Sequence, residues 1–196
     1  PHAAYAALKS ERPVRLHLSR RQAIVSTTCR PSLETAIEMG FTKEGRITEC
    51  HVLNDANAEA YAGNAVNLED TMKAKMTRSY KFPSFHFKGR AIYTNTPIGG
   101  GMRGWGAPEM VTPLEIFLNA AARRLGLYPV ELRLRNTYDP GDSEIAHGLS
   151  LGNCRGKDCL TIGAKEFSWD ERRKRPREKG RLRRGFGVAY GGYQNG

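Results

Sequence analysis

The sequence lacks most of the short motifs by which catalytic and metal-binding chains are recognised. None of its four cysteines forms a CxxC pair, and none of its five histidines forms an HxxxH or HExxH pair. Zinc-ribbon, ferredoxin-type and zinc-protease sites therefore have no support. There is no GxSxG for a hydrolase nucleophile and no GxxxxGK followed by Ser or Thr for a P-loop. No motif identifies a catalytic group in this chain.

Long apolar runs are also missing. No run reaches membrane-spanning length, and the first residues do not have the layout of a signal peptide. The 196 residues are 39% hydrophobic and 26% charged, which is typical of a soluble globular protein. We expect a cytoplasmic protein whose cysteines are reduced thiols. Because the sequence begins with Pro1 rather than methionine, it is expected to be a fragment or a processed product.

The positive charge is concentrated in one short segment. The chain has a net charge of +11, and the run from Arg172 to Arg184 holds nine basic residues and one acid, Glu178. Such a run is typical of a nucleic-acid contact or of a solvated connector. No aromatic residue lies within it to stack on bases, which favours the connector.

The first third of the chain has clear element signals. Residues 3–9 are helix-like, and residues 12–18 alternate as a strand does. Ser19 and Gln22 have the spacing of a capping box, which predicts a short helix from that point. Residues 33–41 and 46–54 flank a turn that ends in glycine, and they predict a β-hairpin.

The middle of the chain continues the alternation of strands and helices. Residues 55–67 are small and polar and are predicted to be a loop, residues 68–78 a helix, and residues 85–93 a strand. Apolar residues from Leu114 to Leu125 then recur with helical spacing, with Pro113 tolerated in the first turn and Gly126 as the C-cap.

The last predicted helix covers residues 130–136, because Pro129 suits a first helical position. The turn 139–142 follows. Strands and helices in this order, with a hairpin, predict an α+β fold. We predict three parts: a first subdomain over 1–152, a basic connector over 153–184, and the truncated start of a second subdomain, beginning with a strand, over 185–196.

The least ordinary segment is the glycine loop, residues 99–106, which holds five glycines in eight positions. Glycine tolerates positive φ and lets a ligand approach the backbone, and a helix N-terminus downstream suits an anion. The loop matches GxGxxG, but a dinucleotide site requires an acid about 20 residues further on, and that region is the middle of a predicted helix. We therefore interpret the loop as a binding loop of another kind.

At this loop the sequence resembles the molybdenum hydroxylases, the family of xanthine dehydrogenase, aldehyde oxidase and their bacterial relatives. The resemblance is carried by Thr94-Asn95-Thr96-Pro97 and by Gly101-Met102-Arg103-Gly104-Trp105-Gly106-Ala107-Pro108-Glu109. It extends along the chain in family order through Arg12-Pro13-Val14, Ser19-Arg20-Arg21, Arg30-Pro31, Gly40-Phe41 with Gly45, Tyr80-Lys81-Phe82-Pro83, and Arg135-Asn136 with Gly141-Asp142.

The resemblance implies the mixed sheet and helices of the aldehyde oxidase/xanthine dehydrogenase molybdopterin-binding domain. It also implies molybdopterin as the cofactor and assigns roles on the loop. Gly101, Met102, Arg103 and Gly104 would bind the cofactor, with the backbone of Arg103 beside the molybdenum centre. Trp105 would stack on a flat substrate. Thr71 stands where xanthine-specific members carry an arginine, which argues against xanthine. Gly100 replaces the copper-binding cysteine of carbon monoxide dehydrogenases, which argues against that chemistry.

The resemblance also implies what this chain does not supply. The family's Gly-rich Phe loop and its general-base glutamate have no match, and Glu109 is not that base. We expect no catalytic residue here and no turnover by the isolated chain. The implied reaction is hydroxylation of a heteroaromatic or aldehyde C–H with oxygen from water, with electrons leaving through iron–sulfur and FAD domains or subunits. The alternatives are a nucleic-acid-binding module that uses Arg172 to Arg184, or an inactive fragment of a split gene.

Overall fold

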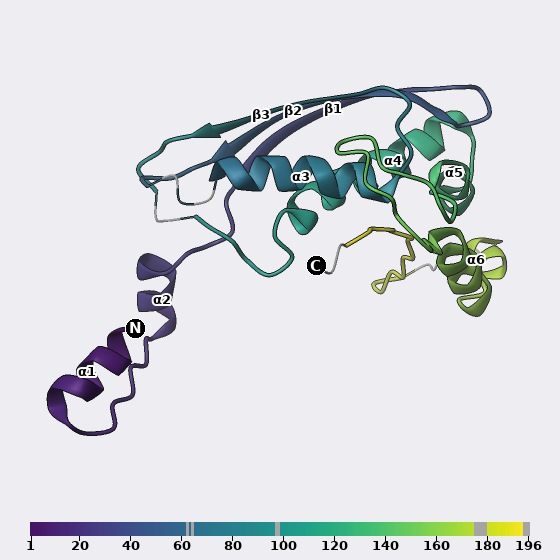
Figure 1. The fold of residues 1–196 in the computed structure, drawn as a ribbon. Coiled ribbons are helices and arrows are strands. Elements are labelled where there is room, and N and C mark those ends of the chain that lie inside the picture. Colours follow the sequence, from purple (N-terminus) through teal and green to yellow (C-terminus); the bar gives the residue numbers. More distant parts are fainter. Residues whose placement is uncertain (62, 64, 97–98, 175–179, 194–196) are drawn as a thin grey trace.

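The body of the protein is a three-stranded sheet with two long helices packed against one of its faces (Figure 1). The computed structural model describes residues 1–61, 63, 65–96, 99–174 and 180–193. Residues 1–28, which we call the N-terminal arm, project away from the body (Figure 1). The mixed sheet and its helices confirm the predicted α+β class.

The sheet has the order β1-β2-β3. Strands β1 (Leu33–Phe41) and β2 (Ile47–Asn57) form the predicted antiparallel hairpin. Strand β3 (Phe85–Ile92) runs parallel to β2, and parallel neighbours require a crossover. Helix α3 (Ala65–Ser79) lies in that crossover. The predicted loop over 55–67 is therefore too long, because its first residues extend β2 and its last residues begin α3.

Helix α4 (Ala107–Leu125) begins directly after the glycine loop and ends at the predicted C-cap, Gly126, with φ of 69°. The prediction that Pro113 lies in its first turn is wrong, because Pro113 lies inside the helix. The buried stripe already includes Met110, one turn before Leu114, so the helix starts earlier than the apolar pattern indicated.

Helix α5 (Pro129–Asn136) has Pro129 in its first turn as predicted. Beyond it the structure differs from the predicted connector, since α6 (Gly156–Glu166) and α7 (Trp169–Lys174) lie within residues 153–184.

No strand forms over residues 185–193. Instead, the backbone amides of Tyr190 and Gly192 donate to the side chains of Glu115 and Ser79, at 3.0 and 3.3 Å. This segment therefore packs on α3 and α4. Within the described residues it has no neighbouring strand with which to pair. The division at residues 152 and 184 stays a prediction.

The N-terminal arm contains α1 (His2–Ser10) and α2 (Arg20–Ser26). Ser19 and Gln22 form the predicted capping box. The predicted strand over residues 12–18 is wrong, because these residues have no partner strand within the described parts of the chain. In those parts, no helix is long and apolar enough to cross a membrane.

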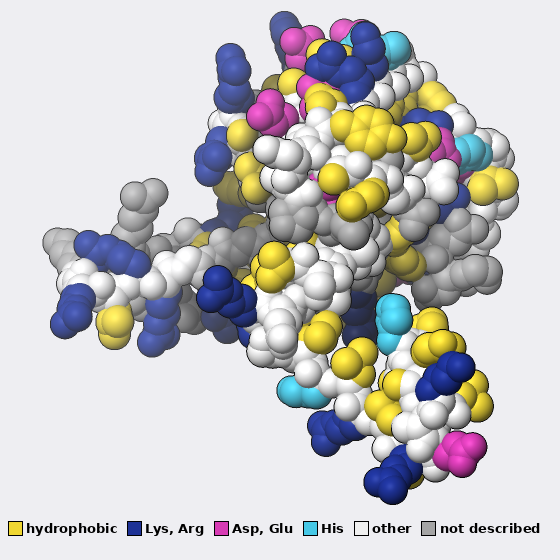
Figure 2. All heavy atoms as spheres, turned by 90° about the vertical axis from the view of Figure 1, so that its left-hand side faces the viewer, with side chains coloured by type: hydrophobic (Ala, Val, Ile, Leu, Met, Phe, Trp, Pro, Cys, Tyr) yellow, Lys and Arg dark blue, Asp and Glu magenta, His cyan; other side chains and the backbone are white. Residues whose placement is uncertain are grey.

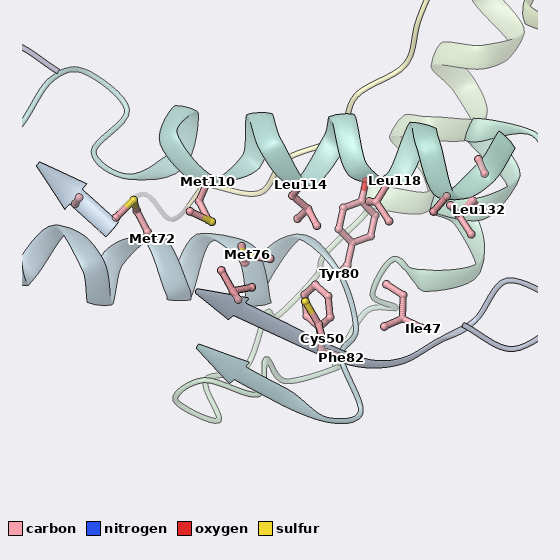
Figure 3. Packing of buried hydrophobic residues seen from close by; sticks show 14 of the residues in the cluster. Ile47, Cys50, Met72, Met76, Tyr80, Phe82, Met110, Leu114, Leu118 and Leu132 are labelled. Carbon is pink, nitrogen blue, oxygen red and sulfur yellow. The ribbon is translucent and has the colours of Figure 1, made fainter. Parts of the chain in front are cut away.

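The hydrophobic core fills the space between the sheet and helices α3 and α4 (Figure 3). Its side chains come from β2, α3, the segment that follows α3, α4 and α5, so segments far apart in the sequence meet there. The fully or almost fully buried members include Ile47, Cys50, Val52, Met72, Met76, Tyr80, Phe82, Met110, Leu114, Leu118 and Leu132. This core holds the N-terminus of α4, and with it the glycine loop, beside α3.

Glu69 is a buried acid of α3 beneath the sheet. Asn54 of β2 donates its amide to both carboxylate oxygens, at 2.9 and 3.0 Å. Burial is the largest cause that raises the pKa of Glu69 to about 7, and the Asn54 hydrogen bonds oppose it. The folded state therefore holds this proton more tightly than the unfolded chain does.

This pKa predicts a loss of stability as pH rises. Because the folded pKa lies above the unfolded value, stability is fully present below about pH 4.5 and is lost as pH rises through 7. Urea unfolding of Glu69→Gln should remove this component, which amounts to roughly 3 kcal/mol at most. The unfolding free energy of the wild type minus that of Glu69→Gln should fall between pH 5 and pH 8. A difference that stays constant over this range would contradict the assignment.

Candidate functional site

The glycine loop connects the end of the sheet to α4, and its backbone takes conformations that favour glycine. Gly104 and Gly106 have φ of 99° and 81°, and Trp105 between them has φ of 30°. Residues 97 and 98 lie outside the described residues, so the loop is described from Gly99 onward. The sharp turn at 104–106 places residues 101–103 on the surface just before the helix.

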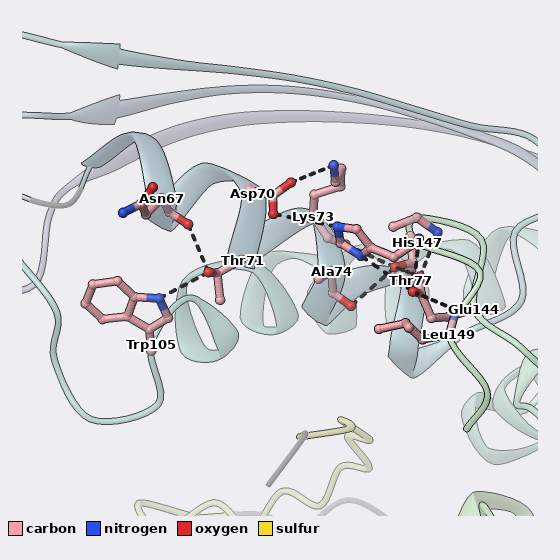
Figure 4. A network of polar contacts seen from close by, with 11 residues as sticks. Asn67, Asp70, Thr71, Lys73, Ala74, Thr77, Trp105, Glu144, His147 and Leu149 are labelled. Carbon is pink, nitrogen blue, oxygen red and sulfur yellow. Dashed lines mark hydrogen bonds and ion pairs between the residues drawn. The ribbon is translucent and has the colours of Figure 1, made fainter. Parts of the chain in front are cut away.

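Trp105 is held between the loop and α3. A Cβ built on Gly101 would lie 1.7 Å from Cζ3 of the indole, so the ring lies directly against that backbone. The indole Nε1 donates to Oγ1 of Thr71 at 3.1 Å, and that hydroxyl donates to the carbonyl of Asn67 at 2.9 Å (Figure 4). The structure thus brings together Trp105 and Thr71, the two residues predicted to contact substrate.

The loop presents unpaired amides at its surface. Among the described residues, the backbone N–H groups of residues 101–104 donate no hydrogen bond. The Arg103 side chain is in an exposed residue and makes no hydrogen bond or ion pair with any described group. Consecutive free amides beside an arginine are suited to an anionic group. The four predicted cofactor-binding residues, Gly101 to Gly104, therefore fit a negatively charged cofactor.

Arg30 ties the loop to the segment that follows the N-terminal arm. Its Nη2 donates to the carbonyl of Arg103 at 2.7 Å, and its Nη1 pairs with Oε1 of Glu109. The amide of Gly100 donates to the carbonyl of Cys29 at 2.9 Å. The Glu109 side chain is only 2% exposed, and Arg30 is its ion-pair partner. Sequence reasoning missed this contact, because nothing local relates residues so far apart.

Removing this arginine is expected to loosen the loop. Arg30→Ala leaves the buried Glu109 carboxylate without its ion pair, and such a loss costs roughly 2 kcal/mol. Urea unfolding measures it, and Arg90→Ala, which breaks the exposed pair with Asp55, is the matched control. The double variant Arg30→Ala/Glu109→Gln should recover part of the loss. Equal unfolding free energies for Arg30→Ala and Arg90→Ala would contradict this account.

The first two residues of the basic run pack against aromatic rings of the fold. Arg172 lies over the ring of Phe167, with 4.4 Å from its Cζ to the ring centroid, and Arg173 lies over Tyr128 at 3.5 Å. Residues 175–179 of the run lie outside the described residues. Arg172 and Arg173 therefore stabilise α7 against neighbouring aromatic rings.

Comparison with known proteins identifies the family of this chain. The family model described as the molybdopterin cofactor-binding domain matches residues 1–137. The chain therefore belongs to the molybdopterin cofactor-binding domain family, as the resemblance implied.

Two relatives show the extent of the match. A putative xanthine dehydrogenase molybdenum-binding subunit of Escherichia coli is 34% identical over 178 residues, which are 90% of this chain and 24% of that protein. Aldehyde oxidase 2 of Macaca fascicularis is 32% identical over 149 residues, which are 73% of this chain and 11% of that protein. The chain thus spans a quarter or less of the length of these relatives.

Solved structures confirm the fold. The aldehyde oxidoreductase of Desulfovibrio gigas superimposes with a TM-score of 0.76 and 25% identity, over 87% of this chain and 19% of that one. The quinoline 2-oxidoreductase of Pseudomonas putida gives a TM-score of 0.76 at 19% identity, over 88% and 23% of the two chains. Nothing among these matches supports the nucleic-acid-binding alternative.

Proposed function

We propose that this chain forms one wall of the molybdopterin site in the molybdenum-binding subunit of a xanthine dehydrogenase/aldehyde oxidase-type oxidoreductase. The observation that carries the proposal is the row of free amides at residues 101–104, beside the exposed Arg103, in a chain of this family. The relatives named as xanthine dehydrogenase and aldehyde oxidase support the same reaction class.

The chain's part in this function is to hold and orient the cofactor and the substrate. Gly101, Met102, Arg103 and Gly104 would hold the cofactor through backbone N–H groups, with the Arg103 backbone nearest the molybdenum. When bound, the cofactor supplies the oxidation by which a C–H next to a heteroatom is hydroxylated with oxygen from water. Arg30 would keep the backbone of Arg103 in place, because the Arg103 carbonyl accepts its hydrogen bond at 2.7 Å.

The substrate contacts would come from Trp105 and Thr71. The indole is packed against Gly101 on one side, so its remaining exposed surface is available to a planar heteroaromatic ring or an aldehyde. The Thr71 hydroxyl donates to Asn67 and accepts from Trp105, which leaves one lone pair for a donor on the substrate. A donating N–H on the substrate fits this site better than an anion does.

The reaction needs groups beyond this chain. We propose that iron–sulfur and FAD domains or subunits carry the electrons away, and that the remainder of the molybdopterin subunit supplies the general base. The test is turnover in isotopically labelled water. The assembled subunit with its partners should place the label in the product from an aldehyde or an N-heterocycle, while the isolated chain should give no product. Unlabelled product, or turnover by the isolated chain, would contradict the proposal.

A further inference from the structure

A cavity lies near the end of α4 that is remote from the glycine loop, where α5 follows (Figure 1). It has a volume of about 530 Å³, which is enough for a small organic molecule. Asn119 and Arg123 of α4 line it. At a rise of about 1.5 Å per residue, these two residues lie about 18 and 24 Å along the helix from Ala107. Because Ala107 directly follows the glycine loop, the cavity does not include that loop.

Aromatic rings form the walls of the cavity. Trp169 of α7 is only 9% exposed, and Phe186 packs edge-on against its indole, with 5.3 Å between the ring centroids. Phe186 and Tyr128 also line the cavity, and they are 46% and 52% exposed. Exposed aromatic faces of this kind suit a planar ring, which packs against them without burying a polar group.

The charge of the cavity lining is positive. Arg123, Arg173 and Lys174 line it, and none of its described lining residues is acidic. On the upper body in Figure 2, by contrast, basic side chains lie beside acidic ones. The charge of Arg173 is partly neutralised, because its Nε lies 2.9 Å from Oδ1 of Asp170. Arg123 and Lys174 form no ion pair with a described group, so their charges are available to a ligand.

Asn119 adds a neutral donor to these cations. Its Oδ1 accepts a hydrogen bond from Nη2 of Arg133 at 3.0 Å, and Arg133 is fully buried, so the amide is held in this orientation. Its Nδ2 donates to no described group. The lining thus holds several donors without a described acceptor, and an anionic group on a ligand would supply acceptors.

We propose that this cavity binds a small planar aromatic molecule that carries a negative charge. The ring of the ligand packs against Tyr128 and Phe186. Its anionic group lies beside Arg123 and Lys174 and accepts from Asn119. An inorganic anion would leave the aromatic faces in water, and a neutral aromatic molecule would leave the cations without a partner. The site is independent of the proposed function, because it makes no use of the glycine loop or the cofactor.

Two fluorescent probes with the same rings test the proposal on the complete molybdenum-binding subunit. 1-Anilinonaphthalene-8-sulfonate carries a negative charge, and N-phenyl-1-naphthylamine lacks the sulfonate. We expect the sulfonate to bind about tenfold more tightly, because only its charged group pairs with the two cations. Equal affinities, or no saturable binding of the sulfonate, would overturn the proposal. Binding by the isolated 196-residue chain but not by the complete subunit would overturn it as well, because another part of the subunit then fills the cavity.

Matched variants assign the binding to this cavity. Arg123→Gln/Lys174→Gln should weaken binding of the sulfonate about tenfold and leave that of the naphthylamine unchanged, since the variant removes charge and keeps most of the side-chain stems. Phe186→Ala should weaken the binding of both probes. Arg124→Gln is the control, because Arg124 is the exposed neighbour of Arg123 on α4 and does not line the cavity. Equal sulfonate affinities for the double variant and for Arg124→Gln would rule out this site. Molybdenum-free subunit should give the same affinities, so a failure here leaves the proposed function standing.

Discussion

Replacing Gly101 by alanine is expected to release the cofactor from the complete subunit. The added Cβ would lie 1.7 Å from Cζ3 and 2.2 Å from Cε3 of Trp105, so either the indole or the loop backbone has to move. Forced overpacking of this kind costs about 1–3 kcal/mol. Because the displaced backbone carries the amides that would bind the cofactor, the affinity for the cofactor is expected to fall about tenfold or more.

Three measurements follow this variant. Elemental analysis should show less molybdenum per subunit, and thermal unfolding should show a modest loss of stability. Tryptophan fluorescence of the isolated 196-residue chain in a Trp169→Phe background reports on Trp105 alone, because this chain has only two tryptophans, and its emission should shift. Gly163→Ala adds the same methyl group on α6, where nothing lies within 4 Å, and is the control. Wild-type molybdenum content with unchanged Trp105 emission would contradict the placement of the loop.

Replacing Arg133 by methionine is expected to have the largest effect on stability. Arg133 is 0% exposed, and its Nε and Nη2 donate to Oε2 of Glu115 on α4 at 2.9 and 2.7 Å. The same carboxylate accepts from the Tyr80 hydroxyl and from the Tyr190 amide. Without Arg133 a buried carboxylate loses its counter-charge, which costs about 3–5 kcal/mol.

The control is Arg135, two residues further along α5. Arg135 forms a partly exposed pair with Glu131, with side chains 30% and 41% exposed. Arg135→Met should therefore cost about 1 kcal/mol or less. Urea unfolding compares the two variants, and Arg133→Met/Glu115→Leu should recover part of the loss. The account fails if Arg133→Met and Arg135→Met unfold at the same urea concentration.

The sequence predicts the elements whose signals are local. The hairpin follows from a turn that ends in Gly45, α5 from Pro129, and the capping box of α2 from Ser19 and Gln22, and each is confirmed. The glycine loop is also visible in the sequence, because five glycines in eight residues are rare in an element interior. Its family resemblance is confirmed by the match over residues 1–137.

Contacts between distant residues are not visible in the sequence. The Arg30–Glu109 pair joins segments far apart in the sequence, and the hydrogen bond from Trp105 to Thr71 depends on how the loop before α4 packs beside α3. The alternation over residues 12–18 describes a strand correctly only when a neighbouring strand exists, and the described chain supplies none. Helix α4 begins earlier than the apolar pattern predicts for a similar reason. Met110 is buried by its packing in the core, which the local pattern does not show.

The most direct test of the account is the molybdenum and pterin content of the complete subunit that contains this sequence. We predict that both are retained through purification, in equal amounts and close to one per subunit. Arg30→Ala should lower both together, because the carbonyl of Arg103 loses its hydrogen bond. A folded complete subunit, purified from cells that make the cofactor, that holds neither molybdenum nor pterin would contradict the proposed function.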